Sequence, residues 1–390
     1  MSRSATRARL LVGLSAVAIL AAACTGGASP SPSAAASTAP SVAPSASAAP
    51  SVAAMYKIGY SNGGGVGNGF REEQVCTAKA EALASGRVSE LITIHRNTDA
   101  AGQLQDIRDL IAADVDAIVF NPNDPDALNP ALAEAQAAGI KTISVDAFVN
   151  DPNTFNLYNN QENYAYLGAK WLFDKLGGQG KVYYMRGFAG HPADTDRHAG
   201  FQRALKENPG IEVLPSIEGE HTQWDPPTTT TLINNFISSG QYDTIQGIWT
   251  SGMDFEVVDA IKAAGKKFVP IVGADRGGFV KQLLDPTGFP DLEGAGVTNT
   301  AAVGGAGVNL AIKLLDGATV QTDPSAPKPN TVLLVPVVQD NLTDAGKAAL
   351  KAWLVEGLDP LWPLGLVIDG YTSYQPEQAI PPTGCKGPGD

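Results

Sequence analysis

The chain has 390 residues, of which 27 are basic and 40 are acidic, and its formal net charge is −13. Removing Arg3, Arg7 and Arg9 with the first 23 residues leaves 24 basic side chains against 40 acidic ones, a net charge of −16. Affinity for nucleic acid comes mainly from Lys and Arg on phosphates, so a chain this acidic is not expected to bind DNA or RNA.

Residues 1–23 have the pattern of a secretory signal peptide. The three arginines precede an apolar run over residues 10–23, which is shorter than the about 20 residues that a membrane-spanning helix needs. Three alanines then lead into Cys24, and this junction resembles a bacterial lipobox, in which the cysteine is acylated and becomes the first mature residue. In the lipobox pattern, leucine is commoner than alanine at the position of Ala21, three residues before the cysteine. An ordinary cleaved signal beside an unrelated cysteine is the alternative.

Residues 25–54 are almost entirely Ser, Ala, Pro, Thr and Gly, and they cannot bury enough apolar surface to fold. We expect segment 24–54 to be a solvated spacer, extended to about 3.1 Å per residue where it is proline-rich. With a lipid on Cys24, it would hold a folded domain at the extracytoplasmic face of the cell membrane. The remaining cysteines, Cys76 and Cys385, are a disulfide candidate outside the cell, and two unpaired buried thiols are the alternative.

The 336 residues that follow are enough for two domains, and they begin with a series of alternating strands and helices. Strands are predicted at residues 56–61, 91–96, 117–121 and 141–145. Helices are predicted at residues 69–86, 101–113 and 127–138. This order predicts a parallel sheet that is covered by helices on both faces.

A second series of similar length follows. Helices are predicted at residues 164–176, 197–206, 228–239 and 256–264. Strands are predicted at residues 181–187, 211–217, 244–249, 268–274, 292–298 and 331–338. Two such series predict two doubly wound lobes whose strand ends can line one cleft. Thr343 caps a predicted helix over 343–356, and residues 359–390 have little periodicity and are expected to form an irregular wrap.

Polar and aromatic side chains follow the predicted strands. The glycine-rich turn after the first strand does not match the dinucleotide pattern G-x-G-x-x-G, but it holds Asn68, Phe70 and Arg71. Asp146 ends another strand, and further residues of this kind in the second series are Arg197, predicted to open a helix, Trp224, Asp275 and Asn299. Donors and acceptors flanked by aromatic rings match a neutral polyol. Taken singly, each residue has an ordinary alternative, such as a helix cap, a tight turn or a core position.

Several ordered segments carry a family resemblance, namely YSNGGGVGNGFR, DLIAADVDAIVFNP, AAGIKTISVD, GFAGHPADTDRHAGF, IVGADR and AGVTN. Over residues 56–338 they resemble the type I periplasmic sugar-binding proteins, especially the ribose- and galactofuranose-binding proteins. The resemblance implies that the same eight side chains contact a sugar: Asn68, Phe70, Arg71, Asp146, Arg197, Trp224, Asp275 and Asn299. Ala147 and the segment 250–254 depart from the ribose-binding pattern, so ribose itself is not implied.

The resemblance also implies a domain layout. An N-terminal lobe would comprise residues 55–159 and 299–330, and a C-terminal lobe would comprise residues 160–298 and 331–342. A multi-strand hinge is expected near residues 158–161, 298–300 and 330–332. The last part, residues 343–390, would be a helix and an irregular tail.

The function implied is capture of a pentose, hexose or furanose by a monomeric lipoprotein, which delivers it to the permease of an ABC importer without a cofactor or metal. A sensor that presents its sugar to a membrane receptor has the same sequence features. An exported glycoside hydrolase is the remote alternative, because no G-x-S-x-G, H-E-x-x-H or Cys–His arrangement is present. A repressor of this fold would need a helix-turn-helix in place of the signal and spacer.

Overall fold

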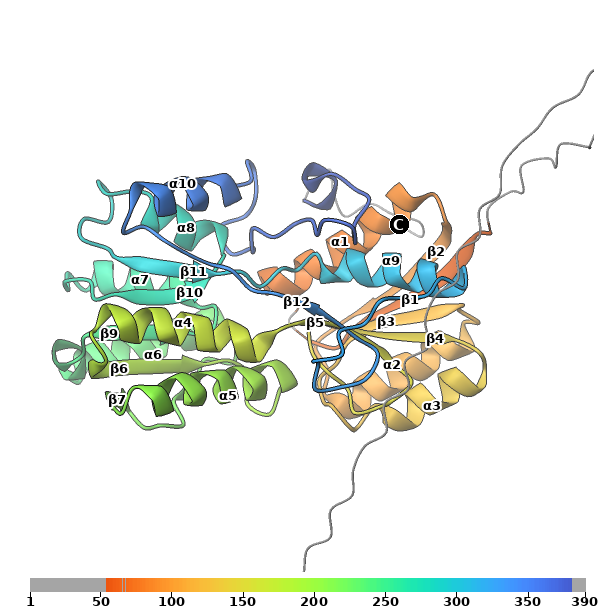
Figure 1. The fold of residues 1–390 in the computed structure, drawn as a ribbon, viewed down its shortest axis with the longest axis horizontal. Coiled ribbons are helices and arrows are strands. Elements are labelled where there is room, and N and C mark those ends of the chain that lie inside the picture. The colour runs from red at the N-terminus through yellow and green to blue at the C-terminus, as the bar shows by residue number, and fades with distance from the viewer. Residues whose placement is uncertain (1–53, 65, 67, 381–390) are drawn as a thin grey trace, which may run out of the picture. The chain divides into compact units, whose positions relative to one another are not determined.

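The computed structural model describes residues 54–64, 66 and 68–380. They belong to one compact unit that begins at Val52 and contains two β-sheets, each with helices on both faces (Figure 1). The predicted α/β class, with two doubly wound and mostly parallel lobes, is therefore confirmed. The predicted signal peptide, nearly all of the spacer, Cys24 and Cys385 lie outside the described residues.

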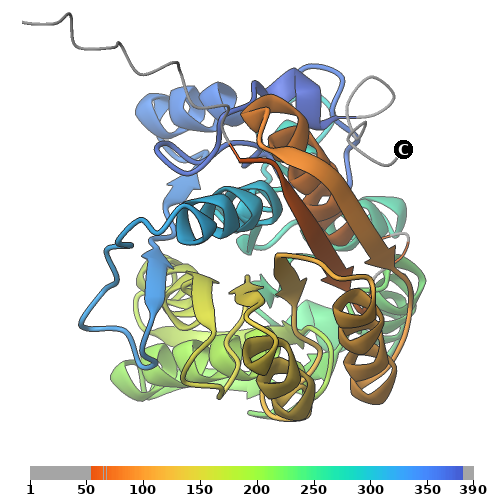
Figure 2. The same ribbon diagram turned by 90° about the vertical axis from the view of Figure 1, so that its right-hand side faces the viewer.

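The first lobe contains a six-stranded sheet in which every neighbouring pair is parallel. In spatial order its strands are β12 (Thr331–Leu334), β5 (Phe155–Asn159), β4 (Lys141–Val145), β3 (Ala117–Asn121), β1 (Tyr56–Asn62) and β2 (Val88–His95). One face packs against α1 (Gly69–Ser85) and α9 (Val303–Leu315), and the other against α2 (Ala100–Ala112) and α3 (Asn129–Ala137) (Figure 2). Because helices cover both faces, all five residues of β3 are buried.

The second lobe contains a seven-stranded sheet. Its strands are β13 (Val338–Asp340), β11 (Gly294–Val297), β10 (Ile271–Ala274), β9 (Gly247–Thr250), β6 (Gln179–Arg186) and β7 (Gly210–Leu214), with the short β8 (Glu220–His221) also paired to β6. β13 runs antiparallel to β11, and the other pairs are parallel. One face packs against α4 (Gln161–Lys175) and α5 (Pro192–Glu207), and the other against α6 (Pro226–Ser238), α7 (Asp254–Ala263) and α8 (Gly277–Leu283). A 3₁₀ turn, η1 (Gln241–Thr244), precedes β9.

Side-chain caps fix where several helices begin. Asn68 caps α1, Asp99 caps α2 and His191 caps α5, each by accepting a hydrogen bond from a backbone N–H of the first turn. The prediction that Arg197 opens a helix is wrong. His191 and the proline at the first position, Pro192, start α5 earlier, which places Arg197 in its second turn.

Three segments connect the lobes. They lie between β5 and α4, between β11 and α9, and between β12 and β13. The predicted third crossing at residues 330–332 is wrong, and so is the assignment of the whole segment 331–342 to the second lobe. β12 pairs with β5 in the first sheet, whereas β13 pairs with β11 in the second. Pro336 lies between them and lacks the N–H that a continuous strand needs, so the single predicted strand is divided.

The tail after β13 returns to the first lobe (Figure 1, dark blue). It contains α10 (Asp344–Trp353), capped by Thr343 as predicted, and a short 3₁₀ turn, η2 (Pro376–Ala379). The Ser373 N–H donates to the Glu81 Oε2 of α1 at 2.6 Å, and the Lys313 Nζ of α9 donates to the carbonyl of Gly370 at 3.2 Å. Leu350 of α10 packs in the hydrophobic core of the second lobe, so the tail is attached to both lobes.

None of the helices in the described part of the chain is long and apolar enough to cross a membrane. Cys76 is buried in α1 and is disulfide-bonded. Its predicted partner, Cys385, lies outside the described residues, so the pairing of these two cysteines stays a prediction.

Candidate functional site

A cavity of ≈ 380 Å³ lies between the two lobes, where carboxyl ends of strands meet the first turns of helices. Its volume is in the range of ~300–1,000 Å³ that is typical of small-molecule sites. Asp275 is not among the lining residues. The other seven residues predicted from the sequence do line the cavity, namely Asn68, Phe70, Arg71, Asp146, Arg197, Trp224 and Asn299.

Asn68 connects the lobes at the mouth of the cavity. Its Oδ1 accepts from the backbone N–H of Arg71 and caps α1, while its Nδ2 donates to the carbonyl of Trp224 at 3.0 Å. Trp224 belongs to the second lobe. The contact therefore exists only while the two lobes are close together.

Arg71 reaches from α1 toward the second lobe. Its Nη1 donates to Asn62 Oδ1 at 2.7 Å, and its Nη2 lies 2.8 Å from His191 Nε2. His191 Nδ1 already accepts from the Ala193 N–H at 3.1 Å. Burial, with Arg71 nearby, lowers the pKa of His191 well below its ordinary value, so the ring is neutral. A neutral imidazole has one acceptor nitrogen, so it cannot satisfy both donors at once.

Asp146 lies directly after β4 with a positive φ of 71°. Its carboxylate accepts from three amide side chains, Gln161 Nε2 at 2.6 Å, Asn159 Nδ2 at 3.0 Å and Asn121 Nδ2 at 3.3 Å. These donors come from both sides of the first crossing. Asp146 is therefore held rigidly. Burial lowers the pKa of Arg71, and the nearby Asp146 carboxylate opposes this shift.

Arg197 is fixed by contacts within the second lobe and at the crossing. Its Nε donates to Gln161 Oε1 at 2.7 Å, and its Nη1 donates to the carbonyl of Ser251 at 3.0 Å. The guanidinium carbon lies 4.2 Å from the ring centre of Tyr164 and 5.6 Å from that of Trp224. These cation–π contacts hold the Arg197 guanidinium against the faces of two aromatic rings.

The Trp224 side chain occupies space that a glycine leaves open. Gln223 and Trp224 both have positive φ, and the indole Nε1 donates to the Ser251 carbonyl at 2.8 Å. A Cβ at Gly187 would lie 2.1–2.5 Å from three indole atoms, which is impossible without movement. The position of the ring in the cavity therefore depends on Gly187.

Asp275 lies beside the cavity, beneath Asn299. Its Oδ1 accepts from the Asn299 N–H at 3.0 Å, and Asn299 Oδ1 accepts from Gln161 Nε2 at 3.0 Å. Burial raises the pKa of Asp275 to about 6, while hydrogen bonds and the nearby Arg197 oppose the rise. Its position indicates that it orients Asn299. Direct contact with a ligand stays a prediction.

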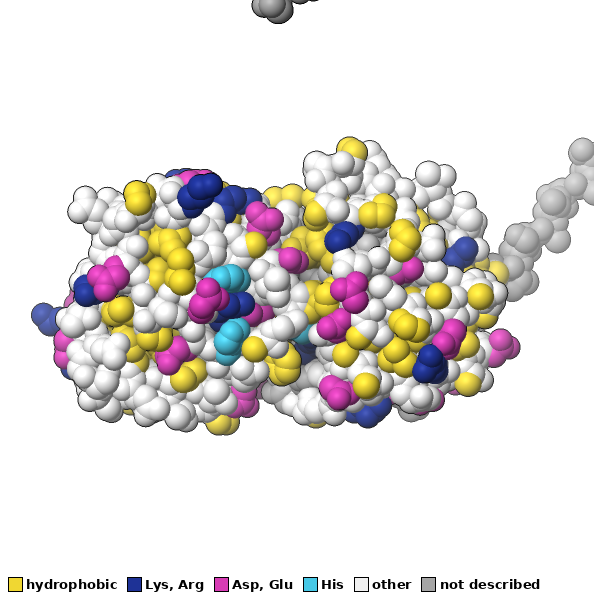
Figure 3. Space-filling view, turned by 90° about the horizontal axis from the view of Figure 1, so that it is seen from below, with side chains coloured by type: hydrophobic (Ala, Val, Ile, Leu, Met, Phe, Trp, Pro, Cys, Tyr) yellow, Lys and Arg dark blue, Asp and Glu magenta, His cyan; other side chains and the backbone are white. Residues whose placement is uncertain are grey.

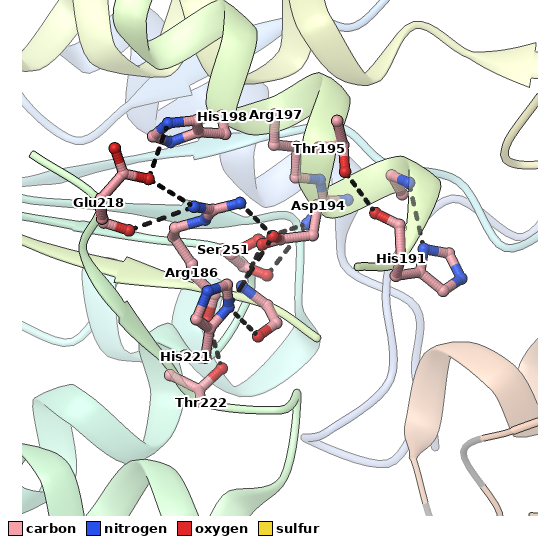
Figure 4. A network of polar contacts seen from close by, with 12 residues as sticks. Arg186, His191, Asp194, Thr195, Arg197, His198, Glu218, His221, Thr222 and Ser251 are labelled. Carbon is pink, nitrogen blue, oxygen red and sulfur yellow. Dashed lines mark hydrogen bonds and ion pairs between the residues drawn. The ribbon is translucent and has the colours of Figure 1, made fainter. Parts of the chain in front are cut away.

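A polar network behind the cavity supports the start of α5 (Figure 4). Asp194 Oδ2 accepts from Arg186 Nη2 at 2.6 Å, and its Oδ1 accepts from the Gly187 N–H at 2.7 Å. At the surface, where basic, acidic and histidine side chains gather on the second lobe (Figure 3), His198 and Arg186 approach Glu218. The network fixes Gly187 and hence the space for the indole. No group of three or more His, Cys, Asp or Glu in the described residues could hold a metal ion.

Residues 58–319 match the periplasmic binding protein domain. The chain belongs to this family. The match covers both sheets except for the last strand of each, and it ends before the tail. The two-lobed architecture with a cavity between the lobes is therefore the family's fold in this chain.

Relatives within the periplasmic binding protein family bind different polyols and sugars. A xylitol-binding protein of Mycolicibacterium smegmatis is 30% identical over 249 residues, which are 63% of this chain and 69% of the relative. The ribose import binding protein RbsB of Bacillus subtilis is 25% identical over 63% of this chain and 78% of its own length. An ABC transporter solute binding protein from Thermobispora bispora is similar in structure, with a TM-score of 0.67 at 22% identity, over 79% of this chain and 90% of that one.

Sequence reasoning missed several residues that line the cavity of this periplasmic binding protein. His191 could have been found from its place before a proline, a pattern typical of a helix start. Asp99 is likewise a helix cap that follows a strand. Leu361 and Pro363 also line the cavity, and they come from the irregular tail. Nothing in their local sequence indicates a place in the site.

Proposed function

We propose that this periplasmic binding protein captures a monosaccharide, a pentose, hexose or furanose, between its lobes and delivers it to the permease of an ABC importer. The observation that carries the proposal is one cavity in which both lobes supply hydrogen-bonding and aromatic side chains. The names of the relatives, which bind xylitol and ribose, support the same class of solute. We assign the chain no catalytic activity.

The charge balance of the site supports a neutral solute. Arg71 lies near Asp146, and Arg197 lies near Asp275, so each cation has a carboxylate close by. An anionic ligand would need a surplus of positive charge in the cavity. A sugar hydroxyl can instead both donate and accept. One placed beside the Arg71 guanidinium and the His191 ring would supply the acceptor that these two donors lack.

We further propose that the chain works at the extracytoplasmic face of the membrane as a monomer, attached by a lipid on Cys24. The support is the lipobox-like junction and the spacer that follows it. Metabolic labelling with a fatty acid would test this. We expect label in the wild-type chain and none in Cys24→Ser, and equal labelling of both would contradict the anchor.

Isothermal titration calorimetry tests the main proposal. The mature chain, with Cys24→Ser to keep it water-soluble, is titrated with pentoses, hexoses, furanoses and pentitols. Arg71→Ala should weaken binding by roughly 10- to 150-fold, because a buried hydrogen bond to a charged group contributes about 1.5–3 kcal/mol.

Arg108→Ala is the matched control. This arginine lies on α2, is partly exposed, pairs with Glu134 at 2.6 Å and does not line the cavity. Its affinity should equal that of the wild type. The proposal fails if no sugar or sugar alcohol binds, or if Arg71→Ala and Arg108→Ala bind equally well.

A further inference from the structure

The tail segment 359–365 lies beyond the family match and yet forms part of the cavity. The match ends at residue 319, whereas Leu361 and Pro363 are lining residues. The segment is therefore a part of the site that belongs to this chain's own C-terminal region.

Backbone hydrogen bonds fix the segment to the second lobe. The N–H groups of Gly277 and Gly278, at the start of α8, donate to the carbonyls of Trp362 and Pro360 at 2.8 and 2.7 Å. The Leu364 N–H donates in turn to the carbonyl of Asp275 at 2.8 Å. Segment 359–365 is thus held like a short extra strand beside the end of β10.

The segment also packs against the first lobe. Thr300 Oγ1 donates to the Gly365 carbonyl at 2.5 Å. A Cβ at Gly69, the first residue of α1, would lie 2.5 Å from the Leu361 carbonyl oxygen and 2.6 Å from the Trp362 ring. Because no larger residue fits at Gly69 without movement, the segment closes one side of the cavity tightly.

The corner of the cavity at this segment offers few free polar groups. The Arg276 side chain lies there, and four of its five N–H donors are used, including an Nη2 donor to Glu256 Oε1 at 3.0 Å. Its Nε donates to the Leu361 carbonyl at 3.1 Å, and its Nη1 donates to Gly252 O and to Glu256 Oε2. Pro363 has no N–H. Met253, which follows Gly252, and Ala274, the last residue of β10, also line the cavity and are apolar.

We propose that segment 359–365 determines specificity, because its corner accepts the edge of a solute that carries only carbon and hydrogen, such as a methyl group or a ring C–H face. The inference rests on the proposed function. A hydroxyl in this corner would lose water and find few partners, which weakens binding by roughly 5- to 150-fold. A sugar that lacks a hydroxyl at that edge avoids this loss.

The test compares solutes that differ by one hydroxyl. Pairs such as D-fucose and D-galactose, L-rhamnose and L-mannose, and 2-deoxy-D-ribose and D-ribose are titrated into the wild-type chain and into Leu361→Asn. In the wild type, the deoxy member of at least one pair should bind as tightly as its partner or more tightly. In Leu361→Asn, which adds an amide to the corner, the affinity ratio of that pair should shift about ten-fold or more toward the hydroxylated sugar.

Two further variants keep the outcome interpretable. Val367→Asn introduces the same polarity in the tail at an exposed position that does not line the cavity, so its affinity ratios should equal those of the wild type. Leu361→Met keeps the corner apolar and should also retain the wild-type ratios. If Leu361→Asn keeps those ratios while its melting temperature is unchanged, the inference is overturned and the proposed function stands. If the wild type binds no sugar at all, both fall.

Discussion

Gly187 leaves the space that the Trp224 indole occupies, so Gly187→Ala should displace this ring from the cavity without touching a ligand itself. Three indole atoms would lie 2.1–2.5 Å from the added methyl group, and the φ of Gly187 is not positive, so the backbone accepts alanine. A displaced ring loses its hydrogen bond to Ser251 and its contact with the ligand. Together these losses amount to ~2–3 kcal/mol, or about 30- to 150-fold in affinity.

A double-mutant cycle with Trp224→Leu tests the reasoning. The smaller leucine should relieve the clash, so Gly187→Ala with Trp224→Leu should bind the preferred sugar within about three-fold of Trp224→Leu alone. If the two substitutions acted independently, their separate fold losses in affinity would instead multiply in the double variant. Calorimetry of the four proteins measures the coupling, and circular dichroism checks that each variant is folded.

Gly277→Ala is the control for this cycle. The nearest atoms to a Cβ at Gly277 are 3.5–3.6 Å away, an ordinary contact distance, so the affinity of this variant should be unchanged. The reasoning is refuted if Gly187→Ala binds like the wild type, or if its effect simply multiplies with that of Trp224→Leu. Either result would mean that the glycine does not set the position of the ring.

Two other predictions concern the lobe contact and a buried acid. Asn68→Asp keeps an acceptor that caps α1, but its side chain cannot donate to the Trp224 carbonyl. The affinity for the sugar should therefore fall about ten-fold while the melting temperature stays unchanged. A loss of stability without a loss of affinity would contradict this prediction. Burial raises the pKa of Asp254 to about 7, so between about pH 4 and 7 the folded state holds a proton that the unfolded state has released. The free energy of unfolding therefore declines as pH rises through this range. Asp254→Asn should therefore raise the melting temperature more at pH 8 than at pH 5. Calorimetric scans that show equal shifts at both pH values would disprove this.

The parts of the fold that follow one simple pattern could be predicted from the sequence. β3 and β4 have the predicted bounds. β3 is covered on both faces and is apolar from Ala117 to Phe120, and β4 is short and rich in β-branched residues. β5 was not predicted, since its buried positions include Asn156 and Asn159, whose side chains bond to Val149 N and Asp146. Amides that satisfy local partners interrupt the apolar pattern on which strand prediction depends.

The residues of the candidate site that could be predicted lie close to a strand end or to the start of the helix that follows. Arg71 is in the first turn of α1 and Asp146 directly follows β4, and both line the cavity. Asp275 has the same sequence context but points beneath Asn299, because the backbone direction after β10 depends on the tail that pairs beside it. Leu361 could not be found at all, because its place depends on contacts between residues about 85 positions apart.

The three crossings mean that neither lobe is a continuous piece of chain. The first sheet takes strands from residues 56–159 and from residues 331–334. The second sheet includes β13, which follows residues 331–334 in the chain. Exchange of one lobe by a single recombination event would therefore leave both sheets incomplete. Evolution of a new ligand preference in this protein has to proceed by point changes at the strand ends and in the tail, and a chimaera built in the laboratory would need several junctions to succeed.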